Sequence, residues 1–309
     1  MDIGIQLPTI GFGSDASFVL EIAQAVDRLG YHSVWTSDHV ALSADRSSVY
    51  PYQESTTELF MTAGLDWLDP IAVMGFVAGC TTRVRIGVGA LVVPYRNPVV
   101  LANMLASLDV LSNGRIILGA GVGWMDEEFP VGVPRQERGA RTDEALEVMR
   151  LLWRSTGPVS FDGRFSSFRD MVLCSHPVQT GGLVPVLIGG NSDGALRRAA
   201  RLGDGWLGME VFVEQVADVR LRLAGFCKEA ERDTSSLTRA VRRGLLPPFE
   251  ITNVLPEQRC IAGSSEEVAT EVRAYAAAGV SLLQLDLAMV VPEVLQTLEW
   301  FASEVAPLL

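Results

Sequence analysis

The stretch VPVLIGGNSDGALRRAARLGDGWLGM, residues 184–209, contains a strand, a helix and a second strand in succession. Its first apolar run ends in two glycines, and the Asn and Ser that follow favour the N-cap of a helix. The helical spacing of apolar residues then gives way to a second short apolar run, DGWLGM. Two buried strands joined by a helix are typical of a parallel sheet.

The same alternation continues in both directions along the chain, about eight times in all, with no linker-like break in composition. The predicted strands cover residues 3–7, 33–37, 84–93, 114–121, 184–190, 204–209, 238–246 and 281–287. The predicted helices cover residues 15–29, 98–111, 137–153, 191–202, 212–232, 264–278 and 291–305, and a further one starts at Asp69-Pro70. Buried parallel strands joined by helices need a sheet that is covered on both faces or closed on itself. Eight units favour an α/β fold of the (β/α)8 TIM-barrel type, which we expect to form a single domain over residues 1–309.

Two segments interrupt this pattern. Residues 41–68 are polar, rich in Ser, Tyr and Pro, and too long for an ordinary connection, so we interpret them as a surface insertion and a candidate lid. Residues 155–182 include VSFDGRFSSF and predict a small excursion that carries a hairpin.

Composition excludes several classes of protein. A formal charge of −12 argues against nucleic acid and anionic membranes as partners. The four cysteines are far apart without a CxxC pair, which argues against zinc and disulfide scaffolds. The start of the sequence lacks the features of a signal peptide, and no stretch has the ~20 apolar residues of a membrane span. We therefore expect a cytoplasmic protein.

The stretch SVWTSDHV, residues 33–40, places Asp38 and His39 where the second predicted strand ends. In a barrel of this type the chemistry takes place at the carboxyl ends of the strands. An imidazole there can exchange a proton near neutral pH, and a neighbouring carboxylate can orient it or hold a ligand. The ordinary alternative is that Asp38 caps a loop and His39 is a surface residue.

Glycines occur inside the predicted strand at 84–93 and at the end of the predicted strand at 114–121. Gly87 and Gly89 indicate either a bulge that admits a ligand or tight packing inside the barrel. The stretch LGAGVGWMDEEF, residues 118–129, has GxGxG rather than GxGxxG spacing and no helix directly behind it, so it does not predict a dinucleotide site. We interpret Gly121 and Gly123 as making room at the barrel mouth. We interpret the acids at 126–128 as a solvated face.

The turn at Gly189-Gly190, Asn191 and Ser192 directs backbone N–H groups and a helix N-terminus to one point, which suits a phosphate. An ordinary turn with a good N-cap is the alternative. Only three histidines occur, without HxH or HExxH spacing, and we therefore predict no catalytic metal.

Several long stretches, in the same order, resemble the bacterial luciferase-like superfamily and, within it, the coenzyme F420 (deazaflavin)-dependent oxidoreductases. They are LGYHSVWTSDHV (29–40), TTRVRIGVGALVVPYRNPVVLANMLASLDVLSNGRIILGAGVGWMDEEF (81–129), ERGARTDEALEVMRLLW (137–153), IGGNSDGALRRAARLGDGW (188–206) and EEVATEVRAYAAAGVSLLQLDL (266–287). The fold of that family is a (β/α)8 barrel, in agreement with the count of strands and helices.

The resemblance implies roles for individual residues. Asp38 matches an aspartate that contacts the deazaflavin ring, and His39 matches a neighbouring histidine that transfers protons in some members. Gly89-Ala90 matches a site where the family often has a non-prolyl cis peptide against the ring. The turn from Gly189-Gly190 to Asn191 and Ser192 matches the phosphate-binding turn. The cofactor-binding residues implied in this way are Asp38, Gly89, Ala90, Gly121, Gly123, Gly189, Gly190, Asn191 and Ser192.

The resemblance also bears on the substrate. The sugar-phosphate dehydrogenases of the family have a glutamate where this chain has Trp124, which argues for a more apolar pocket than a sugar phosphate needs. We expect Trp124 and Glu127 to line the substrate pocket.

The resulting hypothesis is an F420-dependent oxidoreductase that moves a hydride between the cofactor and a small organic substrate, with His39 and Asp38 as the catalytic residues and a homodimer as the assembly. One alternative is an FMN-dependent monooxygenase on the same fold, which would use reduced flavin and O2. A second is a non-catalytic flavin-binding protein. A third, a metal-dependent barrel hydrolase, is disfavoured by the small number of histidines.

Overall fold

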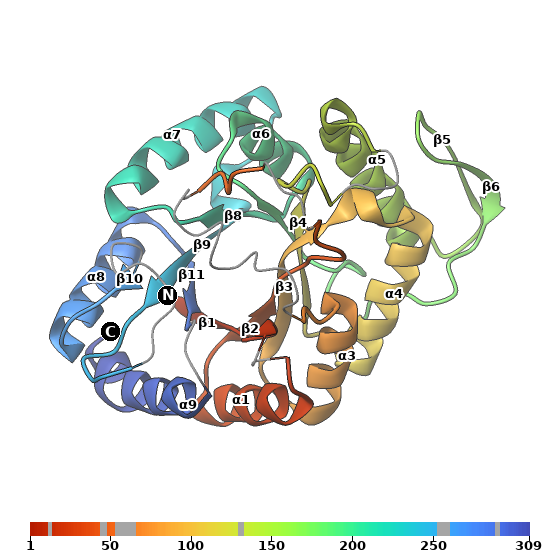
Figure 1. Cartoon of the computed structure of the whole chain (residues 1–309). Helices are drawn as coiled ribbons and strands as arrows, with labels where there is room; N and C mark the ends of the chain where they lie inside the picture. The colour runs from red at the N-terminus through yellow and green to blue at the C-terminus, as the bar shows by residue number, and fades with distance from the viewer. Residues whose placement is uncertain (12–13, 44–47, 53–65, 129–132, 252–259, 288–290) are drawn as a thin grey trace.

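Eight parallel strands form a closed barrel in the computed structural model of the chain, which describes residues 1–11, 14–43, 48–52, 66–128, 133–251, 260–287 and 291–309 (Figure 1). The strands pair in the order β9-β11-β1-β2-β3-β4-β7-β8, and a further pairing of β8 with β9 closes the ring. They are β1 (Asp2–Gln6), β2 (Ser33–Thr36), β3 (Arg85–Val92), β4 (Ile116–Gly121), β7 (Val186–Gly189), β8 (Gly205–Met209), β9 (Thr238–Leu245) and β11 (Leu282–Asp286). The predicted TIM barrel is confirmed, and a strand lies within each of the eight predicted ranges or overlaps it.

Helices surround the barrel and cover its outer face (Figure 1). In the described ranges they are α1 (Ala16–Leu29), α3 (Pro70–Cys80), α4 (Pro98–Leu111), α5 (Arg135–Arg154), α6 (Asp193–Leu202), α7 (Val213–Glu229), α8 (Ser265–Ala278) and α9 (Val291–Trp300). The short helical turns are η3 (Val93–Tyr95), η4 (Thr234–Ser236), the π-helical η6 (Phe301–Val305) and η7 (Ala306–Leu308). The predicted last helix therefore changes from α to π geometry after Trp300.

Local sequence explains where these helices begin and end. The Asp69 carboxylate accepts hydrogen bonds from the backbone N–H groups of Ile71 (2.9 Å) and Ala72 (3.1 Å), with a proline at the first helical position of α3. Helix α1 ends at Gly30, whose φ of 83° lies in the left-handed region that glycine adopts readily.

Side chains fill the inside of the barrel, and Trp35 is one of the largest that is fully buried. A Cβ added to Gly87 would lie 2.4 Å from the Trp35 ring, and one added to Gly4 would lie 2.6 Å from its indole nitrogen. Gly87 is therefore explained by packing inside the barrel, the ordinary interpretation of that glycine. A small apolar cluster on the strands surrounds this tryptophan: Ile117, Leu187, Leu207, Ala240 and Leu282.

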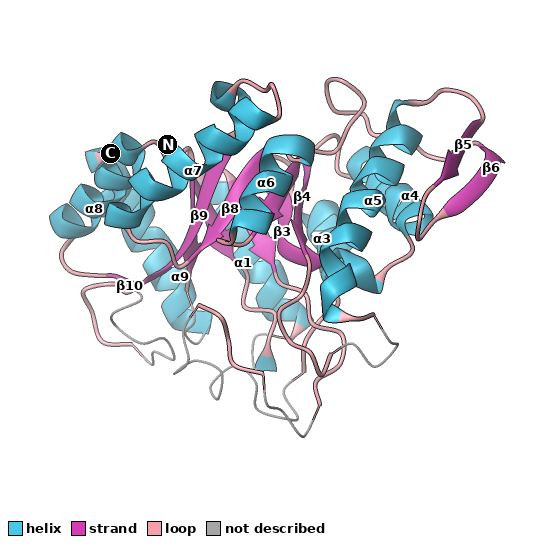
Figure 2. Cartoon of the chain, turned by 90° about the horizontal axis from the view of Figure 1, so that it is seen from above, coloured by secondary structure: helices cyan, strands magenta, loops and turns pink. Residues whose placement is uncertain are grey.

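The second insertion is a hairpin, as predicted, formed by β5 (Val159–Asp162) and β6 (Ser167–Met171), and it projects from the side of the barrel beside α4 and α5 (Figures 1 and 2). The two-residue strand β10 (Cys260–Ile261) pairs with β9. Of the first insertion, 41–68, the described residues are 41–43, 48–52 and 66–68. Within the described ranges, no helix combines the length and apolarity that crossing a bilayer requires.

Candidate active site at the barrel mouth

A cavity of about 170 Å³ lies where β2, β3, β4, β7, β8 and β9 end. Most of the residues predicted for the site line it, namely Asp38, His39, Gly89, Ala90, Gly121, Gly123, Trp124, Gly189 and Gly190. Other lining residues were not predicted, namely Ser37, Tyr50, Tyr52, Val92, Val122, Glu128, Met209 and Arg242.

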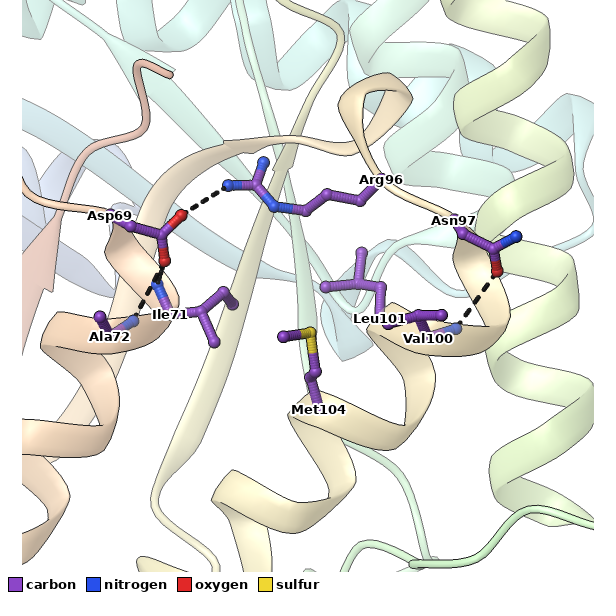
Figure 3. Close-up of a pocket in the computed structure, with 8 residues that line it drawn as sticks. All are labelled: Asp69, Ile71, Ala72, Arg96, Asn97, Val100, Leu101 and Met104. Carbon is purple, nitrogen blue, oxygen red and sulfur yellow. Dashed lines mark hydrogen bonds and ion pairs between the residues drawn. The ribbon is translucent and has the colours of Figure 1, made fainter. Parts of the chain in front are cut away.

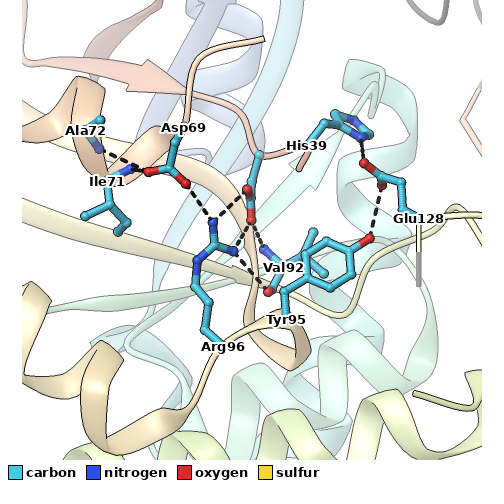
Figure 4. A network of polar contacts seen from close by, with 9 residues as sticks. His39, Asp69, Ile71, Ala72, Val92, Tyr95, Arg96 and Glu128 are labelled. Atoms are coloured by element: carbon cyan, nitrogen blue, oxygen red, sulfur yellow. Dashed lines mark hydrogen bonds and ion pairs between the residues drawn. The ribbon is translucent and has the colours of Figure 1, made fainter. Parts of the chain in front are cut away.

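His39 is held by a buried glutamate. Its Nδ1 lies 2.6 Å from Oε1 of Glu128, a residue of the loop after β4 (Figure 4). The Tyr95 hydroxyl donates to the other oxygen of Glu128 at 3.2 Å. The side chain of Glu128 is 1% exposed and that of His39 is 12% exposed, so the pair is shielded from solvent on the glutamate side. The interpretation of Glu128 as part of a solvated acidic face is wrong.

Asp38 is tied to the protein through both of its carboxylate oxygens. Arg96 forms a bidentate ion pair with it, with N–O distances of 2.6 and 2.9 Å, and the Val92 backbone N–H donates to it at 2.7 Å. Arg96 also reaches the Asp69 carboxylate at 3.3 Å, so β2, the end of β3 and the start of α3 are joined (Figure 4). Burial acts to lower the pKa of Arg96, but the hydrogen bonds and charge of Asp38 outweigh it, and the net shift is upward.

Small residues form the floor of the cavity. The Gly89-Ala90 peptide bond is cis, as the resemblance implies, at a point where the register between β3 and β4 shifts. A Cβ added to Gly121 would lie 3.1 Å from the Ala90 methyl group, and one added to Gly189 would lie 2.9 Å from it. Glycines at these positions therefore leave a smooth, shallow surface around Ala90.

The turn after β7 is organised by hydrogen bonds within the protein. The Gly190 N–H donates to the Leu207 carbonyl at 3.1 Å, and its φ of 116° requires glycine. The Asn191 side chain bridges to the backbone N–H and carbonyl of Met209 at 3.0 and 2.7 Å. Ser192 caps α6 by accepting from the Ala195 N–H at 3.3 Å. Asn191 and Ser192 are not among the residues that line the cavity.

Aromatic side chains form one wall. The Tyr50 ring lies 5.3 Å from those of both Trp124 and Tyr52, in edge-on arrangements. The Trp67 ring lies 4.2 Å from the imidazole of His39. Burial raises the pKa of Tyr52, so its hydroxyl stays protonated. Tyr50, Tyr52 and Trp67 all belong to the first insertion, which therefore contributes to the site.

A search with family models matches residues 3–246 to luciferase-like monooxygenases. The chain belongs to this family. An uncharacterised protein of Mycobacterium tuberculosis is 34% identical over 196 residues, 63% of this luciferase-like chain and 66% of that protein. An F420-dependent glucose-6-phosphate dehydrogenase of Amycolatopsis mediterranei is 31% identical over 208 residues, 64% of this chain and 56% of the dehydrogenase. The matches therefore span less than two thirds of the length of these relatives.

Solved structures share the luciferase-like fold over the full chain. An F420-dependent secondary alcohol dehydrogenase, in complex with an F420–acetone adduct, has a TM-score of 0.80 at 20% identity and covers 100% of this chain and 99% of its own. A monooxygenase from Streptomyces bottropensis has a TM-score of 0.80 at 22% identity, with 99% of each chain covered. At 20% and 22% sequence identity, this structural similarity shows that the fold is shared.

Two polar residues of this luciferase-like site had no clear signal in the sequence. Glu128 lies in a run of three acids, and Arg242 lies next to Arg243 in a strand. Arg242 forms a close ion pair with Asp286 at the end of β11. Burial acts to lower the pKa of Arg242, but Asp286, Tyr50 and Glu210 outweigh it and the net shift is upward. A charged residue inside a predicted strand was the one available hint.

Glu127 lies beside the site rather than in it. It does not line the cavity, and its Oε1 accepts from the Ser48 backbone N–H at 2.9 Å. The Ser48 hydroxyl in turn accepts from the Asp126 N–H at 3.0 Å. The Glu127 carboxylate and the Asp126 backbone therefore attach Ser48 to the loop after β4. Among the described residues, no group of three or more His, Cys, Asp or Glu is placed to hold a metal ion.

Proposed function

We propose that the chain is a coenzyme F420-dependent oxidoreductase, in which a hydride passes between the deazaflavin and a small organic substrate. The observation that carries the proposal is His39 at the barrel mouth, fixed through Nδ1 to the buried Glu128, beside the glycine-lined surface around Ala90. An imidazole held in this way can exchange a proton at its other nitrogen. The similarity to F420-dependent dehydrogenases supports the proposal.

The residues at the mouth fit a flat ring system. A Cβ atom at position 121 or 189 would lie against the Ala90 methyl group and fill the space around it. Glycine at both positions leaves that surface open for a ring. The Ser37 hydroxyl is buried at the cavity and has no hydrogen-bond partner within the described residues, which leaves it available to a polar edge of a ligand. Gly89, Ala90, Gly121, Gly123, Gly189 and Gly190 would hold the ring, and the turn at Asn191 and Ser192 would face its phosphate.

The protein residues have separate tasks in this proposal. The cofactor, when bound, supplies the hydride chemistry. Asp38, clamped by Arg96 and Val92, fixes the end of β2 so that His39 keeps its position. His39 takes or gives the substrate proton at Nε2, and the aromatic wall of Tyr50 and Trp124 keeps water away.

Binding requires movement of residues 48–52. The cavity of about 170 Å³ is smaller than the roughly 300–1,000 Å³ that is usual for ligand sites, and a tricyclic ring needs the larger volume. Tyr52 lies close to Gly190, because its hydroxyl is 3.5 Å from where a Cβ of that glycine would be. The segment with Tyr50 and Tyr52 therefore has to move outward to admit the cofactor.

The second candidate function is an FMN-dependent monooxygenase. It is supported by the structural likeness to the monooxygenase from Streptomyces bottropensis and to a Baeyer-Villiger monooxygenase in complex with FMN, whose TM-score is 0.76 at 17% identity. Titrating the purified protein with F420 and, separately, with FMN, and following fluorescence, distinguishes the two. We expect tighter binding of F420, and tight FMN binding with none of F420 would overturn the proposal.

Turnover distinguishes an enzyme from a flavin-binding protein. We expect reduction or oxidation of F420, followed by absorbance, with at least one member of a panel of alcohols, ketones, enones and imines. The variant His39→Ala is expected to bind F420 normally and to lose turnover by ~100-fold or more. Binding of F420 with no turnover of any panel member would favour the non-catalytic alternative.

We also propose a homodimer that uses the outer faces of α3 and α4. Helix α3 has no charged residue, and the single one of α4, Asp109, is buried and accepts hydrogen bonds from Val178 and Gln179. A groove of about 520 Å³ runs between the two helices (Figure 3). Its lining residues are the apolar Ile71, Ala72, Val100, Leu101 and Met104, together with Asp69, Arg96 and Asn97. Because copies with a charge of −12 repel one another, a face that is largely apolar, and whose two charged residues pair with each other, favours contact between copies.

A further inference from the structure

We infer that Glu128 is the positioning residue of the site: it holds His39 in the tautomer that carries its proton on Nδ1, so that Nε2 is presented to the substrate. The inference deepens the proposed function, on which it rests for the reaction itself. The state of the imidazole is a property of the protein alone and can be measured without cofactor.

The chemistry of the contact determines which atom carries the proton. An ionised carboxylate only accepts hydrogen bonds, so at 2.6 Å from Oε1 of Glu128 the Nδ1 atom of His39 must be the donor. In the neutral imidazole the other nitrogen, Nε2, then carries the lone pair. Within the described residues Nε2 has no hydrogen-bond partner, and His39 lines the cavity. A base with its lone pair turned to the cavity is the arrangement that proton transfer requires.

Glu128 is itself held in place. Its side chain is 1% exposed, and the Tyr95 hydroxyl donates to Oε2 at 3.2 Å, so both oxygens have a defined partner. Burial raises the pKa of Tyr95, and the charge of Glu128 raises it further, so the phenol remains a donor. The imidazole is confined by the Trp67 ring at 4.2 Å and the Trp124 ring at 6.3 Å. Glu128 therefore sets the orientation of the ring as well as its tautomer.

Other charged and titratable groups lie around this pair. They are Asp38 with Arg96, Arg138 with Asp126, Arg242 with Asp286, and the hydroxyls of Tyr50, Tyr52 and Tyr95. Within the described residues, Glu128 is the group that forms a hydrogen bond with the His39 side chain.

The first test is nuclear magnetic resonance of protein with 15N-labelled histidine. The chain has three histidines, so the variant His39→Gln assigns the resonances of His39 directly. We expect wild-type His39 to populate the Nδ1–H tautomer when neutral. In Glu128→Gln both tautomers should be populated, because an amide can accept from Nδ1 or donate to it. A neutral Nε2–H tautomer in the wild-type protein would overturn the inference, whether or not any variant folds.

The second test uses the F420-dependent reaction. For Glu128→Gln we expect kcat to fall by about 10- to 100-fold with KM changed less than about twofold, because the imidazole is no longer held with its proton on Nδ1. Glu128→Asp should recover part of the rate and keep the wild-type tautomer. Glu229→Gln, which removes a surface ion pair with Arg197, is the charge control and should behave as wild type. An unchanged kcat and tautomer in Glu128→Gln would overturn the inference, whereas a wild-type protein that neither binds nor turns over F420 would overturn only the proposed function.

Discussion

At the scale of single residues, Arg96 connects the site to the scaffold. It pairs with Asp38, whose side chain is fully buried, and its own side chain is 16% exposed. In Arg96→Met the aspartate would keep the Val92 N–H but lose its counter-charge, which in a buried pair costs about 3–5 kcal/mol. Denaturant unfolding at pH 7 measures this loss. Arg135→Met, which removes an exposed pair with Asp126, should change the free energy of unfolding by less than about 1 kcal/mol. Equal effects of the two variants would contradict this account of Asp38.

The residue scale is also where prediction from sequence was weakest. Asp38 and His39 could be selected because they are adjacent and follow a predicted strand. Glu128 could not, because its partner is 89 positions away and an acid in a loop with two other acids is usually solvated. Only the folded loop after β4 brings that carboxylate against the imidazole.

At the scale of strands and helices, the effect of a Gly→Ala substitution depends on whether the glycine lies inside the barrel or on a surface helix. In Gly87→Ala the new methyl group would lie 2.4 Å from the Trp35 ring, which is fully buried and cannot move aside. Overpacking of this kind destabilises a core by about 1–3 kcal/mol or more. Gly225→Ala, in the middle of α7 with open space at the Cβ position, should instead stabilise the protein by up to ~1 kcal/mol. Thermal or denaturant unfolding of both variants measures whether each substitution lowers or raises the free energy of unfolding. A Gly87→Ala protein as stable as wild type would contradict the packing around Trp35.

One carboxylate of α1 accepts three backbone hydrogen bonds from the turn between α3 and β3. Asp27 accepts from the backbone N–H groups of Thr82 (3.1 Å), Arg83 (2.9 Å) and Val84 (2.7 Å). Burial acts to raise the pKa of Asp27, but these hydrogen bonds, led by that of Val84, outweigh it and the pKa lies below its ordinary value.

The sign of the pH dependence follows from that shift. A carboxyl group with a lower pKa in the folded protein stabilises it above the unfolded pKa, and the contribution is lost as the pH falls through the folded pKa. Asp27→Asn should therefore reduce the free energy of unfolding by about 1–2 kcal/mol at pH 7, and the difference from wild type should shrink below about pH 4. Urea unfolding at pH 7 and at pH 3 tests this. A deficit that is the same at both pH values would mean that the charge of Asp27 contributes nothing.

At the scale of the whole molecule, the barrel could be predicted because its information is local and repeated. Each unit has an apolar run, a turn and an amphipathic helix, and signals such as Asp69-Pro70 mark where a helix begins. Eight such units in succession are enough to form a closed barrel. The pairing of β8 with β9 closes the ring of strands. The position of residues 48–52 at the mouth depends instead on contacts such as that of Ser48 with Glu127, 79 positions apart, which no local pattern encodes.

The outer face of the barrel leads to a prediction about assembly. Phe76, Val100, Met104, Val110 and Leu111, all on α3 and α4, are among the large apolar residues that are exposed. A helix that is apolar on all sides is usually buried, and α3 is of this kind, so a second copy of the chain that covers α3 and α4 would remove the exposed face from water.

Met104→Glu places a charge in the groove between α3 and α4, where Met104 is 43% exposed. If that groove is the dimer interface, the charge would be buried without a partner, and dimer affinity should fall by about 2–4 kcal/mol, or roughly 30- to 1,000-fold. Leu221→Glu on α7 is the matched control, because Leu221 is 75% exposed and lies outside that face. Sedimentation velocity over a range of concentrations should show a wild-type and Leu221→Glu dimer and a Met104→Glu monomer. A wild-type monomer, or a Met104→Glu protein that associates as the control does, would rule out this face as the interface.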